Sequence, residues 1–167
     1  MASPFDSLTD DDLDRFRTEA KRKASGTRLK AKPKQIFLEQ QFELASVDNP
    51  ERMYRLYRRH HPQIDGVFSV GLAVCLGSDW LTICRYNGSY HPHRNHIERN
   101  RLINVCHIHL ATQRYILQAA HPDGYAEATD KYASIDGAFR CMLLDSNISG
   151  VLPDGDTHPE TKDLDFE

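Results

Sequence analysis

The sequence lacks several features that would place the protein in a membrane or outside the cell. No apolar run approaches the about 18 residues that a membrane-spanning helix requires. The segment MASPFDSLTDDD at the N-terminus is acidic and has no apolar stretch typical of a secretory signal. The four cysteines show neither close pairing nor CxxC spacing, which favours reduced thiols over a disulfide framework or a zinc ribbon. We therefore expect a soluble cytoplasmic protein with no membrane partner.

The sequence is too short for two large cores, and it contains no visible internal repeat. Its 167 residues, of which 40% are hydrophobic and 27% charged, suit one domain. We place this domain at residues 7–150. Residues 151–167 contain six carboxylates, one lysine and few large apolar side chains, which predicts an acidic disordered tail.

Helix signals occur near both ends of the expected domain. Thr9 is a suitable N-cap with Asp12 three residues later, and Gly26 is a candidate terminator, so we expect a helix at about 10–24. Near the other end, Ser134 can cap a helix whose apolar residues recur with the helical period. The sequence thus predicts an N-terminal and a C-terminal helix.

Strand patterns fill the region between these helices. IFLEQQFELA and MYRLYRRH flank turn-forming residues and predict a hairpin, and FSVGLAVCL and WLTICRY predict two further strands. A polar loop at about 87–101 then leads to an expected last strand, LINVCHIHLATQRYI. Because no crossover helix separates neighbouring strands, we predict an α+β single domain with a mostly antiparallel sheet of about five strands.

Clustered histidines are the strongest functional signal. The chain has nine histidines, and five lie between residues 91 and 109. On a strand, His107 and His109 share a face with Cβ atoms roughly 6.5 Å apart, since each residue rises about 3.3 Å. Together with His93 from the preceding loop, these imidazoles are candidate catalytic groups for acid–base chemistry near neutral pH. The same three side chains are alternative ligands for a divalent metal such as zinc.

A second metal site is suggested by the loop itself. His91, His93 and His96 lie close together in sequence, and Glu98 could add an oxygen ligand. The segment HPHRNH is similar to the HxHxDH signature of metallo-hydrolases, but Asn95 stands in place of the aspartate. Surface histidines without a function are a third interpretation of the cluster.

Arg85 and Asn87 end the strand that feeds the histidine loop, and an arginine fork commonly binds phosphate oxygens. Strict alternation from Leu81 and Ile83 would turn Arg85 toward the core. A bulge at the strand end, or a strand that outruns the core, would return Arg85 to the histidine side. The alternative interpretation pairs Arg85 with an acid at the sheet edge.

Basic and aromatic residues alternate in the segment MYRLYRRHH, as they do in surfaces that stack bases and bind phosphates. This pattern suggests contact with a nucleic acid, either RNA or DNA. The candidate substrate-binding residues are Arg94, Asn87, Arg55, Arg58 and Tyr57.

Several motifs resemble a small bacterial and phage family of about 150 residues. The matching pieces are Leu8-Thr9-Asp10-Asp11, Arg85, Pro92-His93-Arg94-Asn95, His107-Ile108-His109 and Asn147-Ile148. Asn87 stands where the family usually has Asp, and residues 111–115 replace an R-E-G-Y-G segment after the HxH strand. The arrangement is also similar to TumE-like toxins of toxin–antitoxin pairs, and this resemblance implies ribonuclease activity.

Our leading hypothesis is a toxin-like or phage-encoded ribonuclease that needs no metal or other cofactor. His93, His107, His109 and Arg85 would carry the chemistry. One alternative is a non-enzymatic protein that binds a protein partner, such as an antitoxin or a component of phage defence. The other is a histidine-ligated metal protein.

Overall fold

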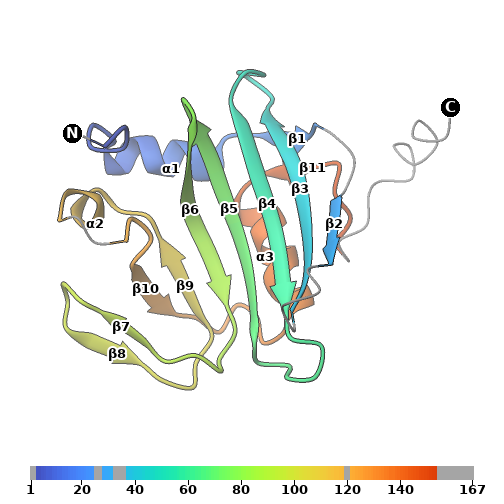
Figure 1. Ribbon diagram of the computed structural model, residues 1–167, viewed down its shortest axis with the longest axis vertical. Coiled ribbons are helices and arrows are strands. Elements are labelled where there is room, and N and C mark those ends of the chain that lie inside the picture. Colours follow the sequence, from blue (N-terminus) through green and yellow to red (C-terminus); the bar gives the residue numbers. More distant parts are fainter. Residues whose placement is uncertain (1–2, 25–27, 32–36, 119–120, 154–167) are drawn as a thin grey trace, which may run out of the picture.

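The computed structural model describes residues 3–24, 28–31, 37–118 and 121–153, with only the backbone of 28–31. In these residues the chain forms one nine-stranded sheet, with a separate two-stranded sheet beside it (Figure 1). The main sheet has the order β10-β9-β6-β5-β4-β3-β1-β11, and β2 pairs with β3 beside this path. The predicted tail at 151–167 falls almost entirely outside the described residues.

The strands of the large sheet differ widely in length. The long strands are β3 (Leu38–Ser46), β4 (Met53–His60), β5 (Phe68–Leu76) and β6 (Asp79–Asn87). The short strands are β1 (Lys21–Lys23), β2 (Arg28–Ala31), β9 (His107–Leu110), β10 (Tyr125–Ala128) and β11 (Ile148–Ser149). The separate hairpin consists of β7 (His93–Asn95) and β8 (Asn100–Leu102).

The predicted fold class was wrong. The protein is a mostly-sheet structure whose main sheet has nine strands rather than about five, and β1 and β11 pair in parallel, so the sheet is mixed. The strands that we missed are two to four residues long, which is too short for alternation of apolar side chains to be recognised. The expected last strand was also wrong, because residues 102–116 divide among the end of β8, β9 and a helix.

The sequence-based prediction was more accurate for the long strands than for the short ones. The strands β3 and β4 pair antiparallel, as do β4 and β5, and β5 spans the predicted segment 68–76. The hydrophobic alternation was strong there because each strand packs one face against the core. These strands supply the centre of the sheet.

Three helices complete the described structure: α1 (Asp10–Thr18), α2 (Gln113–Leu117) and α3 (Ile135–Asp145). Thr9 and Asp12 form the predicted capping box, and the Ser134 hydroxyl accepts from the backbone N–H of Gly137. However, α1 ends at Thr18 rather than near residue 24, because the chain enters β1 at Lys21. Gly26 lies outside the described residues. None of the described helices is long and apolar enough to cross a membrane.

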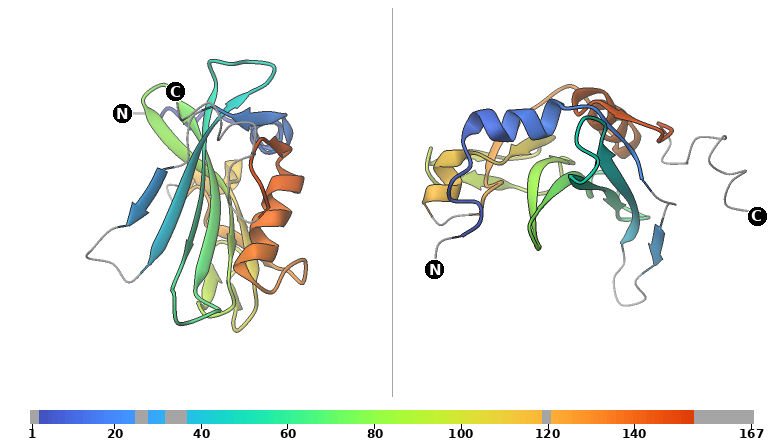
Figure 2. Two further views of the ribbon diagram at one scale, coloured as in Figure 1. Left: turned by 90° about the vertical axis from the view of Figure 1, so that its right-hand side faces the viewer. Right: turned by 90° about the horizontal axis from the view of Figure 1, so that it is seen from above.

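Both α1 and α3 lie on the same side of the sheet (Figure 2). We call this side the helix face, and its fully buried core side chains include Phe42, Leu56, Leu72, Ile83 and Phe139. We call the opposite side the open face. Alternation along β4 shows the division, since Leu56 is fully buried on the helix face and Tyr57 points the other way.

Lys21 joins the ends of the two large helices. Its ammonium group donates to the backbone carbonyls of Arg17, Glu19 and Ser146, at distances of 2.8–3.0 Å, and the residue is fully buried. Burial lowers the pKa of this side chain to about 8. These bonds satisfy carbonyls at the C-terminal ends of α1 and α3 and fix both helices against β1.

A bulge in β6 decides which residues reach the open face. Leu72 pairs with Cys84 whereas Ala73 pairs with Thr82, so Ile83 is an extra residue in the ladder. Leu81 and Ile83 are buried in the core, and after the bulge Arg85 points to the open face. Of the two solutions that the sequence left open, the structure has a bulge, but this bulge lies in the middle of the strand rather than at its end.

Candidate active site

Two cross-strand rows of polar residues occupy the open face. In the first row, Tyr57 pairs with Gly71, Gly71 with Arg85, and Arg85 with His109. In the second row, the successive partners are Arg59, Ser69, Asn87 and His107. Since paired residues in neighbouring strands share a face, the register places Arg85 beside the two strand histidines.

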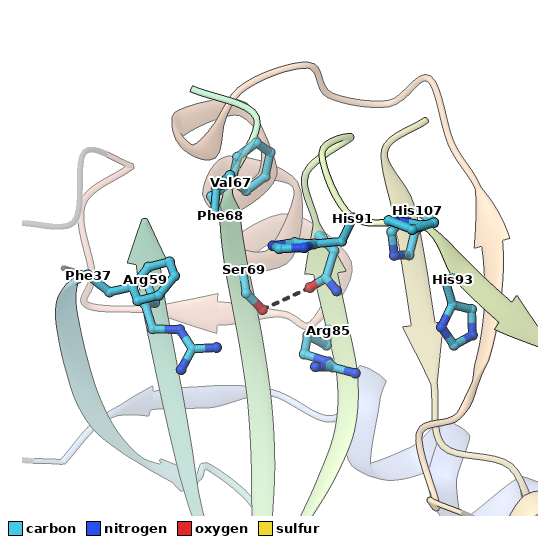
Figure 3. A pocket seen from close by; sticks show the side chains of 11 residues that line it. Phe37, Arg59, Val67, Phe68, Ser69, Arg85, His91, His93 and His107 are labelled. Atoms are coloured by element: carbon cyan, nitrogen blue, oxygen red, sulfur yellow. Dashed lines mark hydrogen bonds between the residues drawn. The ribbon is translucent and has the colours of Figure 1, made fainter. Parts of the chain in front are cut away.

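The structure brings His93, His107 and His109 together. Their ring centroids are separated by 4.4 Å for His93 and His109, 5.0 Å for His107 and His109, and 5.8 Å for His93 and His107. The strand β9 holds two of the rings, and β7 places His93 beside them. Figure 3 shows His93 and His107 at one end of a pocket, with Arg85 nearby.

Each ring is fixed by a backbone carbonyl. Nδ1 of His107 lies 3.0 Å from the Val105 carbonyl oxygen, and Nδ1 of His109 lies 2.9 Å from that of Asp123. Nε2 of His93 lies 2.8 Å from the carbonyl oxygen of Gly124. Because a carbonyl only accepts, these nitrogens carry the protons. A neutral ring then presents a lone pair at Nε2 of His107 and His109, and at Nδ1 of His93.

Asn95 attaches the β7–β8 hairpin to the edge of the large sheet. Its Oδ1 accepts from the N–H of Ala126, and its Nδ2 donates to the carbonyl of Ala126, both at 2.8 Å. His93 bonds to Gly124, two residues earlier on the same edge. Two alternate side chains of β7 thus take the place of a neighbouring backbone strand, and they cover the edge of β10.

The side chain of Arg85 lies between Asp123 and the ring of Tyr57 in the first row. Its Nε lies 3.2 Å from Oδ2 of Asp123, without the geometry of a hydrogen bond. A Cβ atom at Gly71 would lie 2.3 Å from the ring of Tyr57, so this ring rests directly on the glycine backbone. Only glycine permits this approach, which sets Tyr57 level with Arg85 in the first row.

The strand histidines are kept from taking up protons. Burial, followed by the charge of Arg85, lowers the pKa of His109 to about 3. Burial also lowers the pKa of His107, against the effect of its bond to Val105. The two rings are only 1% and 3% exposed, so they are neutral near pH 7. A neutral imidazole has a lone pair that can accept a proton, as a general base requires, but a pKa of about 3 makes His109 a weak base while the charge of Arg85 is uncompensated.

Two hollows open on this surface beside the rings. The first, of about 300 Å³, is lined by Arg59 and His107 among others. The second, of about 520 Å³, is lined by Tyr57 and His109 among others. Both include Arg85 in their walls. The cluster is therefore reachable although its strand histidines are almost buried.

The charge of the two hollows favours an anion. Apart from Asp123, the ionisable lining consists of arginines and histidines together with Tyr57. The basic or titratable members are Arg59, Arg85, Arg94, His91, His93, His96, His107, His109 and His121. Such a surface attracts phosphate groups, because several guanidinium groups act over a short range.

The other expected substrate-binding residues divide between the two faces. Asn87 lines the first hollow and accepts from the Ser69 hydroxyl at 2.8 Å, and Arg94 lines the second. Arg55 also lies on the open face, in the row beyond Tyr57. Arg58 does not belong to this surface: it is buried on the helix face, where it pairs with Asp136 on α3 at 2.7 Å.

The alternative metal sites receive different support from the geometry. In the described part of the chain, no three histidine, cysteine or acidic side chains are arranged to hold a metal ion. Glu98, suggested as an oxygen ligand in the loop, instead accepts from the hydroxyl of Tyr115 at 2.7 Å and pairs with Arg114. The anchored rings of His93, His107 and His109 do resemble metal-ligating histidines in one respect, since each binds a protein oxygen through its other nitrogen.

Sequence reasoning missed the segment 123–126. Asp123 pairs with Arg85 and orients His109, while Gly124 and Ala126 bind His93 and Asn95. The resemblance to known proteins implied an acidic residue and a glycine after the HxH strand, and residues 111–115 lack both. Asp123-Gly124 supplies these residue types about ten positions later, because α2 intervenes.

Comparison with known proteins adds no further information about the site. The chain matches no protein-family model, no curated protein and no solved structure.

Proposed function

We propose that the protein is a toxin-like endoribonuclease of the cytoplasm that cleaves RNA by acid–base chemistry without a metal. The observation that carries this proposal is the meeting of His93, His107 and His109 within 5.8 Å of one another beside Arg85. Two imidazoles and a guanidinium group are sufficient for the transfer of a phosphoryl group to the neighbouring ribose hydroxyl.

The reaction begins at the ribose 2′-hydroxyl. Nε2 of His109 accepts its proton, and the 2′-oxygen forms a bond to phosphorus. The bond between phosphorus and the 5′-oxygen breaks. His93, which enters the reaction protonated at both ring nitrogens, donates the proton on Nδ1 to this leaving oxygen. After the step His109 carries the proton of the 2′-hydroxyl and His93 is neutral. The products are a 2′,3′-cyclic phosphate and a 5′-hydroxyl. DNA lacks the attacking hydroxyl and is not cleaved by this route.

Arg85 has two effects in this scheme. Its terminal nitrogens donate to the phosphate oxygens, which gain charge as the fifth bond to phosphorus forms. The bound phosphate also offsets the positive charge of Arg85, which is the second largest cause of the low pKa of His109. Substrate binding therefore makes His109 a stronger base at the moment when a base is needed.

The test compares variants on a labelled RNA in the presence of a chelator. We expect His93→Ala and His109→Ala each to reduce the rate of cleavage by about 10²–10⁴-fold. His60→Ala is the matched control, since His60 lies on the helix face of β4 and lines neither hollow. A 2′-deoxy substitution at the cleaved position should abolish the reaction.

Two results would contradict the proposal. Unchanged cleavage in both histidine variants would show that the cluster has no catalytic role. Activity that disappears with chelator and returns with zinc would favour the histidine-ligated metal site instead, and elemental analysis of the purified protein would check that result directly.

A further inference from the structure

We propose that the substrate is single-stranded RNA, and that it crosses the open face between two arginine–aromatic pairs at the two ends of β4. This inference rests on the proposed function, because the strand delivers its phosphates to the histidine cluster. It adds the conformation of the substrate and its path over the protein.

The first pair consists of Arg55 and Trp80. The guanidinium carbon of Arg55 lies 4.1 Å from the centroid of the indole ring, and Trp80 is 38% exposed. Both residues lie on the open face, since Arg55 pairs with Ala73 and Trp80 with Cys75. A large exposed aromatic ring beside a guanidinium group is a platform on which an unpaired base can stack while its phosphate is bound.

The second pair consists of Arg59 and Phe37. The guanidinium carbon of Arg59 lies 5.3 Å from the centroid of the Phe37 ring, and both residues line the first hollow. Figure 3 shows the two side chains at the end of this hollow that is farther from His93. The pair repeats the chemistry of Arg55 and Trp80 at the other end of β4.

The two pairs lie on either side of the cross-strand row that contains Arg85 and His109. Arg55 and Arg59 are four residues apart on one strand, or about 13 Å at 3.3 Å per residue. Tyr57 lies midway, in the same row as Arg85 and His109. The two hollows share the wall formed by Arg85 and extend from β4 toward the histidines: the first joins Arg59 and Phe37 to His93 and His107, and the second joins Tyr57 to His109. Because β5 and β6 separate β4 from β9, a strand held at both pairs must bend through the hollows to bring a phosphate to the histidines.

This arrangement selects an unpaired strand. A base can stack on Trp80 or Phe37 only when it is not already stacked within a duplex. Surfaces that combine stacked aromatic rings with bound phosphates are typical of proteins that bind single-stranded nucleic acids. A duplex would present its phosphates to Arg55 and Arg59 but would gain nothing from the two rings.

Trp80 is the single tryptophan of the chain, so its fluorescence reports on one end of this path. We would titrate the whole protein with a fully 2′-O-methylated RNA, which cannot be cleaved, as a single strand and as a blunt duplex. The single strand should change the tryptophan fluorescence and should bind with the same Kd by fluorescence anisotropy of a labelled strand. The duplex should bind more weakly and leave the tryptophan signal unchanged.

Three variants and one control localise the binding. Trp80→Ala should weaken single-strand binding by about 5-fold or more, which is the lower end of the effect of losing one stacked base. Arg55→Ala and Arg59→Ala should each reduce the slope of log K against log salt concentration by about 1. Arg140→Ala is the matched control, since Arg140 is an exposed residue of α3 on the opposite side of the sheet.

The outcomes separate this inference from the proposed function. Equal binding of duplex and single strand, or an Arg140→Ala effect as large as those of Arg55→Ala and Arg59→Ala, would overturn the path. In that case, cleavage that still depends on His93 and His109 would continue to support the proposed ribonuclease activity. Conversely, the variants could change single-strand binding as predicted while the parent protein cleaves no RNA. This result would support the path and contradict the proposed function.

Discussion

The two faces of the large sheet are built from the same strands and differ in nearly everything else. On the helix face, most alternate residues of β3–β6 are apolar and buried against α1 and α3, and the buried Arg58 of β4 is an exception. On the open face, the intervening residues are mostly polar or small. They include arginine, tyrosine, serine and asparagine on β4–β6, together with Gly71 and Ala73, and Glu39, Gln41 and Glu43 on β3. One set of alternate residues therefore specifies the fold, and the other is free to carry chemistry. This division predicts that substitutions on the two faces have separable effects.

The largest effect on stability is expected on the helix face. Phe139 is fully buried in α3, with its ring 5.9 Å from that of Phe42 and 4.8 Å from the guanidinium carbon of Arg58. We expect Phe139→Ala to lower the free energy of unfolding by about 3–5 kcal/mol, because the vacated space cannot be refilled. Urea denaturation measures this change. Tyr57→Ala, on the open face, should cost much less, and an equal loss would contradict the division between the faces.

The second prediction concerns pH and His109, which with His107 is one of two titratable and deeply buried residues in the histidine cluster of the open face. Above about pH 6.5, His109 is unprotonated in both the folded and unfolded states and does not affect stability. Between about pH 6.5 and 3, His109 takes up a proton in the unfolded chain but not in the folded protein. The free energy of unfolding should therefore fall by about 1.4 kcal/mol per pH unit in this window from His109 alone.

The control for the pH prediction is His109→Gln, which removes the titrating group. Denaturation curves at several pH values should show a shallower decline in the variant, by about one proton. His107 contributes in the same direction and remains in both proteins. Equal slopes in the two proteins would mean that His109 titrates normally and is not held neutral by burial and Arg85.

The difference between the faces also explains what the sequence could predict. The helix face follows a simple rule, since large apolar side chains alternate along β5, and this pattern located the strand. The sequence also placed His107 and His109 on one face, because a two-residue period determines the side of a strand. The bulge at Ile83 that turns Arg85 outward could be anticipated only as one solution of a conflict in the alternation.

What the sequence could not show depends on contacts between distant segments. Asp123 and Gly124 have no local pattern, and they join the site only because β10 pairs with β9. Asn95 looked like a failed metal ligand, whereas its role in the structure is to bind the backbone of a strand 31 residues away. Arg58 was assigned to the wrong surface, since the run of basic and aromatic residues in β4 alternates between both faces of the sheet.

The third prediction tests this attachment of the hairpin. Asn95 is 1% exposed, and its removal leaves the buried N–H and carbonyl of Ala126 without their partner. We expect Asn95→Ala to lower the free energy of unfolding by about 1–3 kcal/mol. Because His93 also loses a neighbour on which it is aligned, cleavage should fall by up to about 10²-fold under conditions in which the variant is folded.

Asn100→Ala is the matched control for the hairpin, since Asn100 is an exposed amide in β8 whose Oδ1 accepts from Asn95. This change should alter stability and cleavage only slightly. Comparable losses in the two asparagine variants would show that the hairpin as a whole matters, rather than the contact of Asn95 with β10.

The smallest predicted effect on stability is that of Gly71→Ala, and a second substitution should reverse its sign. In Gly71→Ala, the new Cβ would lie 2.3 Å from the ring of Tyr57, so the ring must move away from the sheet. We expect a loss of about 1 kcal/mol in the free energy of unfolding, together with weaker cleavage as Tyr57 leaves its place beside Arg85. In a Tyr57→Ala background the clash no longer exists, and alanine is favoured over glycine within a strand by about 0.5–1 kcal/mol. Gly71→Ala should therefore destabilise the parent protein and stabilise the Tyr57→Ala variant in urea denaturation. The same sign in both backgrounds would show that Gly71 is required for a reason other than the ring that lies on it.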